Sequence, residues 1–514
     1  MQHSGLRLTC ALAITGLLAI TPVHAQQPTV PVHVTGGAVS GSDNGVVRTF
    51  FGVPYAAPPV ADLRWRAPQP VQPWTGVRDA RAFSPVCRQT APWISNPQSE
   101  DCLYLNIWAP EKAEKLPVMV WIHGGGLFGG TGAQSLYDGA KLTRRGVIVV
   151  TINYRLGVFG FFADPELTKE SPDHASGNQG IADQIAALQW VKANIAAFGG
   201  DPDRVTIMGE SAGAESVAVL VASPQAKGLF QRAIAESGNG AMPIDPSEDA
   251  QFDHTTAEAQ GVAFMHAQGA ANLAELRRMD ADTLIRQPWT PRVIVDGHVL
   301  CEDMTTIYNH HRQNDVPLLV GWNADEGKDL APEILGTNDF TAANHAGLVA
   351  KLLGHAPSPA VLQAYPGATD AQAEASINQL TTDWWGWRMW YWADQQVKAG
   401  GRSPYVYYFV HNPTEPAEPC GYGCGAGHGA EIRYVFDQLD QDTRLWSDED
   451  RQLSARLADY WTNFAKTGNP NGADLPVWPA FDGANGMVFR IGNADEITKR
   501  GALPDFAQFG RQEK

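Results

Sequence analysis

The sequence predicts an α/β protein with a central, mostly parallel β-sheet that is flanked by helices. Two continuous apolar runs, "LPVMVWIHGGG" (116–126) and "GVIVVTINY" (146–154), resemble strands covered on both faces, as in a parallel sheet. Segments with the apolar spacing of a helix lie between such runs, for example residues 181–202. Strands that alternate with helices in this way are typical of α/β folds.

The remaining elements continue this alternation. The helix at 181–202 is expected to stop at its glycines and proline, and it leads to "RVTIMGESAG" (204–213), a strand followed by a sharp turn. A second helical segment, "AESVAVLVA" (214–222), follows the turn directly. Three short strands are then expected: "RAIAES" (232–237), "VPLLVGW" (316–322) and "PYVYYFV" (404–410). No repeat or long linker interrupts the chain, so residues 26–514 are interpreted as one domain.

The first 25 residues have the features of a secretory signal peptide. Arg7 precedes the apolar run "LTCALAITGLLAI", and the site "VHA" ends at Ala25, where we expect cleavage. The run is too short to span a bilayer, and no second apolar stretch of membrane length follows. The mature protein is therefore expected to be secreted or periplasmic, without a membrane anchor.

Composition excludes several classes of protein. The chain of 514 residues is 44% hydrophobic and 18% charged, which is unlike a disordered protein. Its formal net charge of −17 disfavours polyanionic partners, so we expect no binding to nucleic acid. Oligomeric state is left open by these observations.

Cysteine usage admits two interpretations. Five cysteines follow the expected signal peptide: Cys87, Cys102, Cys301, Cys420 and Cys424. An oxidising compartment favours disulfides, and the odd number leaves one thiol over. The spacing of Cys420, Cys424 and His428 also permits a zinc site with Cys301 as a fourth ligand, but such sites usually carry closer cysteine pairs. We therefore expect no metal.

Two glycine-rich turns follow predicted strands. "GGGLFG" (124–129) formally matches a dinucleotide-binding fingerprint, but the next strand ends "TINYR" without the carboxylate that such a site needs. "GESAG" (209–213) is the only G-x-S-x-G in the chain, and it lies between a strand and a helix. That context is the one that a nucleophile elbow requires, which makes Ser211 a candidate nucleophile.

A serine nucleophile needs a base, and the base needs an acid that orients it. In α/β-hydrolases these residues follow in the order Ser, Asp/Glu, His. "NADEG" (323–327) places Asp325 and Glu326 directly after a predicted strand. The last predicted strand leads to "CGYGCGAGHGAE" (420–431), a glycine-rich loop that contains His428, the candidate base.

At this point the sequence resembles the type-B carboxylesterases, the family of the cholinesterases and bacterial para-nitrobenzyl esterases. The similarity covers nearly the whole mature chain, and its most specific motifs are "EDCLYLNIW" (100–108) and "GESAG". Other matching segments are "FFGVPYAAPPVADLRWRAPQP" (50–70), "VMVWIHGGGLFGG" (118–130), "INYRLGVFGF" (152–161), "NADEG" (323–327), "GHGAEIRYVF" (427–436) and "YWTNFAKTGNPN" (460–471).

The resemblance implies an α/β-hydrolase fold and a cofactor-free esterase that acts on small-molecule esters. Ser211 would be its nucleophile, Glu326 (rather than Asp325) its acid and His428 its base. The implied oxyanion hole consists of the amides of Gly125, Gly126 and Ala212. The resemblance also implies a Cys87–Cys102 disulfide, whereas proximity and compartment suggest a second, Cys420–Cys424, with Cys301 left free.

Aromatic residues are the candidates for the substrate pocket. The segment "DWWGWRMWYWADQQ" (383–396) is interpreted either as core packing or as an aromatic wall that includes Trp384 and Trp385. Phe128 is a further candidate, and the resemblance suggests that Trp289 borders the acyl pocket. These residues favour bulky or aromatic esters.

Substrate choice is less well determined than the reaction. The implied first disulfide encloses only fourteen residues, with Trp93 among them, which disfavours choline esters. Amide, carbamate and lactone bonds are alternatives for the same triad. A non-catalytic binding module is a second alternative, disfavoured because Ser211, Glu326 and His428 are all retained.

Overall fold

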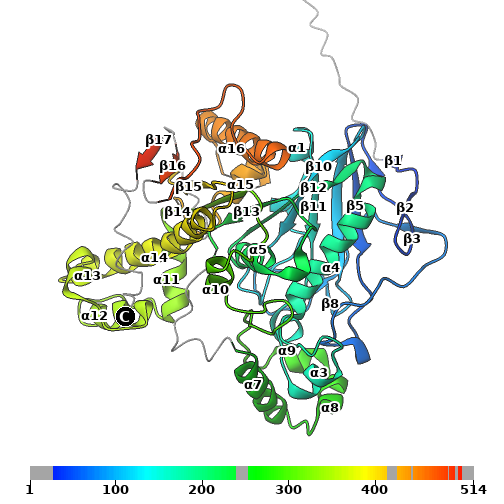
Figure 1. Ribbon diagram of the computed structural model, residues 1–514, viewed down its shortest axis with the longest axis horizontal. Helices are drawn as coiled ribbons and strands as arrows, with labels where there is room; N and C mark the ends of the chain where they lie inside the picture. The colour runs from blue at the N-terminus through cyan, green and yellow to red at the C-terminus, as the bar shows by residue number, and fades with distance from the viewer. Residues whose placement is uncertain are drawn as a thin grey trace, which may run out of the picture.

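The computed structural model describes residues 27–238, 253–413, 425–441, 444–483, 486–492 and 496–499. The predicted signal peptide (1–25), Cys420 and Cys424 lie outside these residues. Within them, twelve strands form one large sheet, which runs through the molecule (Figure 1). In spatial order these are β1 (Gln27–Pro28), β4 (Ser42–Asp43), β5 (Val47–Pro54), β9 (Tyr104–Pro110), β11 (Ile148–Ile152), β10 (Leu116–Ile122), β12 (Gly200–Glu210), β13 (Arg232–Glu236), β14 (Leu318–Asn323), β15 (Tyr405–Phe409), β16 (Met487–Ile491) and β17 (Glu496–Lys499).

The centre of this sheet is parallel, as the sequence predicts. Every pairing from β11 to β16 is parallel, whereas β9, β5, β4 and β1 at one edge and β17 at the other pair antiparallel. All six predicted strands from 116 onward are confirmed. Two small sheets accompany it: β2 (Val32–Val34), β3 (Gly37–Ser40) and β6 (Val77–Asp79), and β7 (Val86–Cys87) with β8 (Gln98–Ser99).

Helices cover both faces of the sheet, which explains why its strands are continuously apolar. Val118, Val120 and Ile122 of β10 belong to the core on the side of α4 (Gln179–Asn194) and α5 (Ala212–Ala222). Met119 and Trp121 belong to the opposite core, with α15 (Ile432–Val435) and α16 (Asp448–Thr467). Because neighbouring side chains on a strand point to opposite faces, each β10 residue meets an apolar layer.

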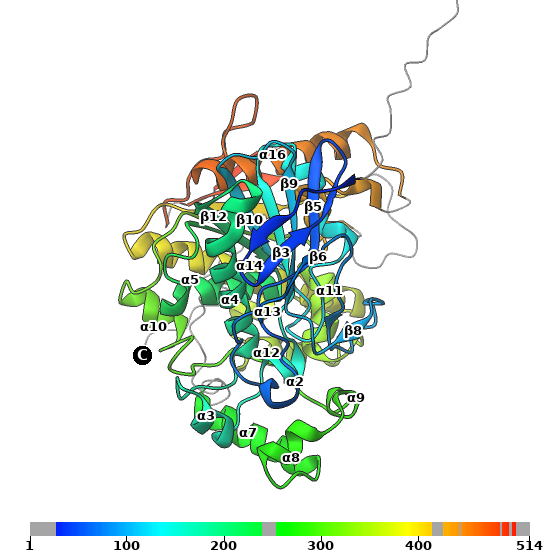
Figure 2. The same ribbon diagram turned by 90° about the vertical axis from the view of Figure 1, so that its right-hand side faces the viewer.

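The other helices lie beyond these layers. They are α1 (Ala140–Thr143), α2 (Gly157–Gly160), α3 (Pro165–Glu170), α7 (His254–Ala267), α8 (Leu273–Arg278), α9 (Ala281–Ile285), α10 (Met304–Asn309), α11 (Glu326–Leu335), α12 (His345–Leu353), α13 (Pro359–Ala364) and α14 (Asp370–Lys398). In both views α3, α7, α8 and α9 gather at one end of the molecule, around their own apolar cluster (Figures 1 and 2). None of the helices that the structure describes combines the length and apolar character needed to cross a membrane.

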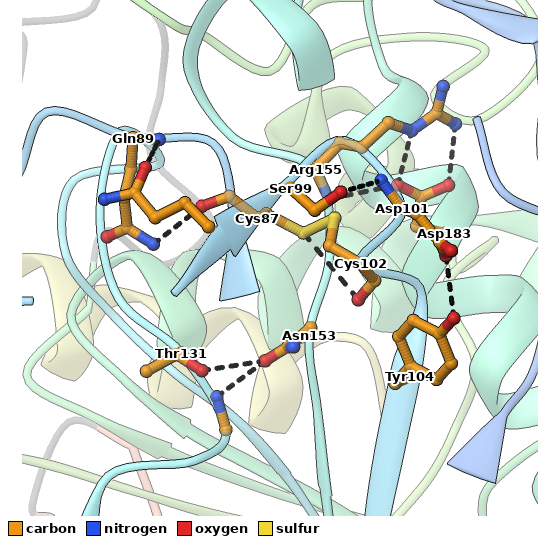
Figure 3. The surroundings of a disulfide bond; sticks show 12 residues. Cys87, Gln89, Ser99, Asp101, Cys102, Tyr104, Thr131, Asn153, Arg155 and Asp183 are labelled. Carbon is orange, nitrogen blue, oxygen red and sulfur yellow. Dashed lines mark hydrogen bonds and ion pairs between the residues drawn. A yellow bond between two sulfur atoms is a disulfide. The ribbon is translucent and has the colours of Figure 1, made fainter. Parts of the chain in front are cut away.

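The predicted disulfide between Cys87 and Cys102 is confirmed (Figure 3). It closes a loop next to the glycine-rich segment that follows β10. The side chain of Gln89 joins the two, since its amide nitrogen donates to the carbonyls of Cys87 and Gly130 at 3.0 and 2.9 Å. Its oxygen accepts from the Gly130 amide at 2.7 Å. Cys301 is exposed and forms no disulfide within the described residues.

Candidate active site

Ser211 occupies a sharp turn between β12 and α5, at the carboxyl edge of the parallel sheet. Its φ of 57° and ψ of −124° are unusual for a residue with a side chain, and such strain often accompanies function. The glycines of "GESAG" make the turn possible: a Cβ on Gly213 would collide with the Ile122 carbonyl oxygen, and one on Gly209 would lie 2.6 Å from the Gly213 backbone. The Ser211 amide donates to the Glu236 carbonyl at 2.9 Å, which ties the turn to β13.

The loop after β10 brings backbone amides towards Ser211. Gly125 and Gly126 have φ values of 101° and 59°, which favour glycine, and a Cβ on Gly125 would collide with the Gly129 carbonyl. The Gly125 carbonyl accepts from the amides of Phe128 and Gly129 at 3.1 and 2.9 Å. Ala212 begins α5, and the first amides of a helix have no acceptor within it. All three candidate oxyanion residues line one cavity with Ser211.

His428 meets a buried carboxylate from α11. Its Nδ1 lies 2.6 Å from Glu326 Oε2, and the other carboxylate oxygen of Glu326 accepts from the Asn323 amide at 2.9 Å. A proton on Nδ1 that is held by this carboxylate leaves Nε2 as the free nitrogen of the neutral ring. Nε2 makes no hydrogen bond within the described residues, although Glu210 Oε1 lies 3.2 Å from it, and a ring nitrogen that carries no proton suits a general base.

Side chains of α11 and the residue before it hold the backbone around His428. Asp329 Oδ2 accepts from the His428 amide at 2.9 Å. Asp325 accepts from the Ala426 amide at 3.0 Å and is ion-paired with Lys328 at 2.8 Å. The structure thus brings Glu326, rather than Asp325, to the imidazole. Asp325 and Asp329 position the loop, a role that sequence analysis did not identify.

Three more buried carboxylates belong to the same electrostatic cluster as His428 and Glu326. Glu210 ends β12, Glu236 ends β13 and Glu431 follows the histidine loop. Glu210 Oε1 lies 3.2 Å from His428 Nε2, and Glu236 accepts from the Trp461 indole at 2.7 Å. Sequence analysis missed them, although carboxylates at the ends of neighbouring parallel strands are expected to meet at one edge.

Burial and mutual repulsion favour protonation in this cluster. Burial raises the pKa of Glu210 to about 8, and it raises the pKa of Glu431 to about 7. Burial by itself lowers the pKa of His428, but the carboxylates of Glu210 and Glu326 outweigh it and raise that pKa to about 10. The site therefore stabilises a positive charge on His428, which a base acquires when it removes a proton from serine.

Ser211 and His428 open into a cavity of about 440 Å³. The ring of Trp385 meets His428 edge to face at 5.8 Å, and its indole nitrogen donates to the Ser237 carbonyl at 2.7 Å. Other lining residues include Trp93, Phe128, Leu136, Tyr137, Glu215, Leu330, Glu333 and Arg433.

The remaining aromatic candidates lie elsewhere. Trp384 does not line the cavity, because its ring packs beneath the Arg388 guanidinium, 3.2 Å from the ring centre. Trp289 packs against Phe162 and Phe264, with ring centres 5.6 and 5.3 Å away, and borders a neighbouring cavity. Other tryptophans of α14 lie in the core: Trp387, Trp390 and Trp392. The tryptophan-rich segment is thus mostly core, and Trp385 is the member that reaches the site.

Metal ligation has no obvious location in the part of the chain that the structure describes. There, no group of three or more histidine, cysteine, aspartate and glutamate side chains is arranged to hold an ion. The alternative zinc site of the sequence analysis involves Cys420 and Cys424, which are outside that part.

Comparisons with known proteins agree on one family. A model of the carboxylesterase family matches residues 26–507. Fumonisin B1 esterase of Sphingopyxis macrogoltabida is 36% identical over 94% of this chain and 91% of its own length. Para-nitrobenzyl esterase of Bacillus subtilis (strain 168) is also 36% identical, over 87% of this chain and 91% of its own length. A solved structure of a PNB esterase superposes with a TM-score of 0.79 at 33% identity, covering 93% of this chain and 99% of that one.

Proposed function

The chain belongs to the carboxylesterase family, and from that premise we propose that it is a secreted serine esterase that works through an acyl-enzyme. Membership of this family and the similarity to solved esterase structures make the chain a carboxylic-ester hydrolase with the α/β-hydrolase fold that the sequence predicts. The proposal adds the mechanism, the residues and the location. Its main support is the 2.6 Å contact of His428 with the buried Glu326, together with the cavity that Ser211 and His428 both line.

In the proposed first step, Ser211 Oγ attacks the ester carbonyl carbon while His428 Nε2 takes the hydroxyl proton. The carbonyl oxygen becomes an anion, which the amides of Gly125, Gly126 and Ala212 stabilise with dipoles that are already oriented. His428 then gives its proton to the leaving alcohol as the ester C–O bond breaks. Glu326 stabilises the imidazolium throughout but keeps its own charge.

Water completes the cycle. His428 removes a proton from water as the water oxygen attacks the acyl carbon, and the same proton returns to Ser211 Oγ when the acid departs. Each step moves one proton between oxygen and Nε2, so no metal or organic cofactor is required. The substrate is a small-molecule ester.

Export is the second part of the proposal. Support comes from the Cys87–Cys102 disulfide, since disulfides persist in oxidising compartments, and from the signal-like first 25 residues. Peptide sequencing of the exported protein should find Gln26 at its N-terminus. A mature protein that begins at Met1, retained inside the cell, would contradict this part alone.

Substrate range is not fixed by family membership, because relatives carry the names of different esterases, fumonisin B1 and para-nitrobenzyl esterase among them. Amides, carbamates and lactones remain alternatives for the same triad. A purely binding module is the other alternative, and it predicts no turnover of any ester.

A covalent probe tests the proposed nucleophile directly. The wild type should hydrolyse 4-nitrophenyl butyrate and take up one fluorophosphonate group, found by mass spectrometry on the peptide that contains Ser211. Ser211→Ala should not take up the label, and its kcat should be lower by about 10⁶-fold, as expected when a triad nucleophile is removed. The neighbouring Ser216→Ala, a buried site on α5, is the matched control and should keep the label. Labelling of another residue would refute the assignment.

A further inference from the structure

A second cavity lies beside the catalytic one. Its volume is about 460 Å³, and Phe128 lines both cavities. The ring of Phe128 is held in place by Trp93, at 5.9 Å edge to face, and by the close approach of Gly126, where a Cβ would lie 2.6 Å from the ring. Phe128 is therefore the wall that the two cavities share.

The two cavities differ in charge. The catalytic cavity has three carboxylates in its lining, Glu210, Glu215 and Glu333. The second cavity has two charged lining residues, Arg88 and Arg286, and no carboxylate. In a chain with a net charge of −17, a cavity lined by cations alone is a local exception that attracts anions.

Arg286 is the more available of the two guanidinium groups. It is exposed, and no ion pair or hydrogen bond engages its side chain within the described residues. Arg88 is paired with the exposed Asp282 at 2.7 Å. Its two neighbours in the chain are restrained, Cys87 by the disulfide and Gln89 by its hydrogen bonds (Figure 3).

Two hydrogen-bond donors at this cavity lack acceptors. The Arg88 Nε and the Trp289 indole nitrogen are both buried, and neither has a partner among the residues that the structure describes. Both belong to lining residues. Buried donors without partners are uncommon, and each demands an acceptor from somewhere. Because both atoms are buried, a ligand in the cavity would instead meet the exposed guanidinium of Arg286 and the neighbouring Arg88, and two cationic groups favour an acidic ligand.

We propose that this second cavity, lined by Phe128, Trp289, Arg88 and Arg286, binds a carboxylate on the ester substrate. The substrate class is then an ester with a free acid group, several bonds from the reacting carbonyl and on the half that extends past Phe128. The inference rests on the proposed function and narrows it. Trp289, absent from the catalytic cavity, forms part of the wall of the neighbouring one.

The test compares esters that differ in one charge. On the acyl side the pair is the 4-nitrophenyl monoester of adipic acid and 4-nitrophenyl heptanoate. On the alcohol side it is the butyrate ester of 4-hydroxybenzoic acid and that of its methyl ester. The measured quantity is kcat/KM for the acidic ester divided by kcat/KM for its neutral partner. Because each ratio is compared between wild type and variants, differences in the intrinsic reactivity of the two esters cancel.

Arg286→Gln should lower this ratio about tenfold for one of the two pairs, mainly through KM, and leave the neutral esters unchanged. Arg286→Glu should lower it further, and 0.5 M NaCl should reduce the wild-type ratio because salt screens an exposed charge. The pair that responds identifies the half of the ester that binds. Arg66→Gln is the matched control: an arginine ion-paired with Glu170, at a different cavity, where the ratio should not change.

Equal ratios in wild type, Arg286→Gln and Arg88→Gln for both pairs would overturn the inference while the neutral esters still turn over. A ratio that falls only in Arg433→Gln would also overturn it, because Arg433 lines the catalytic cavity. Failure of the wild type on every ester would instead refute the proposed function.

Discussion

The nucleophile turn and the histidine loop converge on one cavity, yet they are held in different ways. Around Ser211 the restraints are mainly steric, since Gly209 and Gly213 permit the turn to approach its own backbone and the Ile122 carbonyl of β10. Around His428 the restraints are hydrogen bonds to Asp325, Glu326 and Asp329, about one hundred residues earlier in the chain. The glycines that permit the first region lie within five consecutive residues, whereas the second depends on the packing of α11 against a distant loop.

Breaking the acid contact should have the largest effect on the histidine side. Glu326→Gln keeps the shape but offers Nδ1 a neutral amide, which favours the wrong tautomer and no longer stabilises imidazolium. We expect kcat to fall about 10⁴-fold. Asp325→Asn, one residue away, should cost less than tenfold, because Asp325 contacts the Ala426 backbone and Lys328 instead of the ring. Similar losses in the two variants, measured on one chromogenic ester, would refute the assignment of roles.

Breaking the nucleophile turn calls for a steric change. Gly213→Ala places a methyl group against the Ile122 carbonyl oxygen, so the turn must shift and move Ser211 Oγ. A displacement of about 1 Å is enough to cost on the order of 10²-fold in kcat. Ala214→Gly, the next position on α5, is the control and should lower stability by about 1 kcal/mol with kcat unchanged. If Gly213→Ala kept full kcat, the glycine would not define the turn.

The parts of the structure that the sequence could predict are those encoded in contiguous residues, like the Ser211 turn. Six strands, α4, α5 and the disulfide were predictable because apolar runs, helical spacing and a family motif are written in contiguous residues. Ser211 belongs to this class. The choice between Asp325 and Glu326 came from resemblance, because two adjacent carboxylates after one strand look alike until the direction of α11 is known.

Positions on long helices and in loops were less predictable. Trp384 and Trp385 are neighbours on α14, where successive side chains are rotated by about 100° around the helix axis. This rotation decides which of the two meets His428. The buried carboxylates Glu210 and Glu431 carry no local signal of burial, since their environment is assembled from separate strands and loops. Trp289 packs among aromatic residues of α7 and the segment after α2, which no local pattern indicates.

The pH dependence of kcat/KM tests how the buried carboxylates act on His428, a feature that the Ser211 turn does not share. Since Glu210 and Glu326 raise the pKa of His428 to about 10, imidazolium persists to higher pH than for a free histidine, and imidazolium cannot accept the Ser211 proton. kcat/KM should therefore rise with pH through an apparent pKa above 6.5, which belongs to the coupled cluster rather than to one residue. Glu210→Gln removes one negative charge and so lowers that apparent pKa, which shifts the acid limb of the profile to lower pH. At a fixed pH on the acid limb, kcat/KM should rise about tenfold for each unit by which the pKa falls.

Glu431→Gln is the matched variant for this experiment, since Glu431 contributes least among the carboxylates that raise the pKa of His428. Its acid limb should shift less than that of Glu210→Gln. A profile that is flat from pH 5 to 9 in the wild type would remove His428 from the mechanism.

The smallest effect is expected from the backbone anchor of the histidine loop. Asp329→Ala removes the acceptor of the His428 amide, which now lies 2.9 Å from Oδ2. The Glu326 contact survives this change, so the ring keeps its tautomer but samples more positions relative to Ser211. One hydrogen bond of this kind corresponds to about fivefold in kcat, with KM unchanged. Asp329→Asn still offers an oxygen and should recover most of the loss. Because Asp329 is half-buried, the melting temperature distinguishes two roles. If Asp329 positions the base, Asp329→Ala lowers kcat at temperatures well below the transition, and the acid limb of the pH profile moves with it. If kcat is normal at 25 °C and only the melting temperature falls, Asp329 stabilises the fold without positioning the base, and the histidine loop is then held by Glu326 and Asp325 alone.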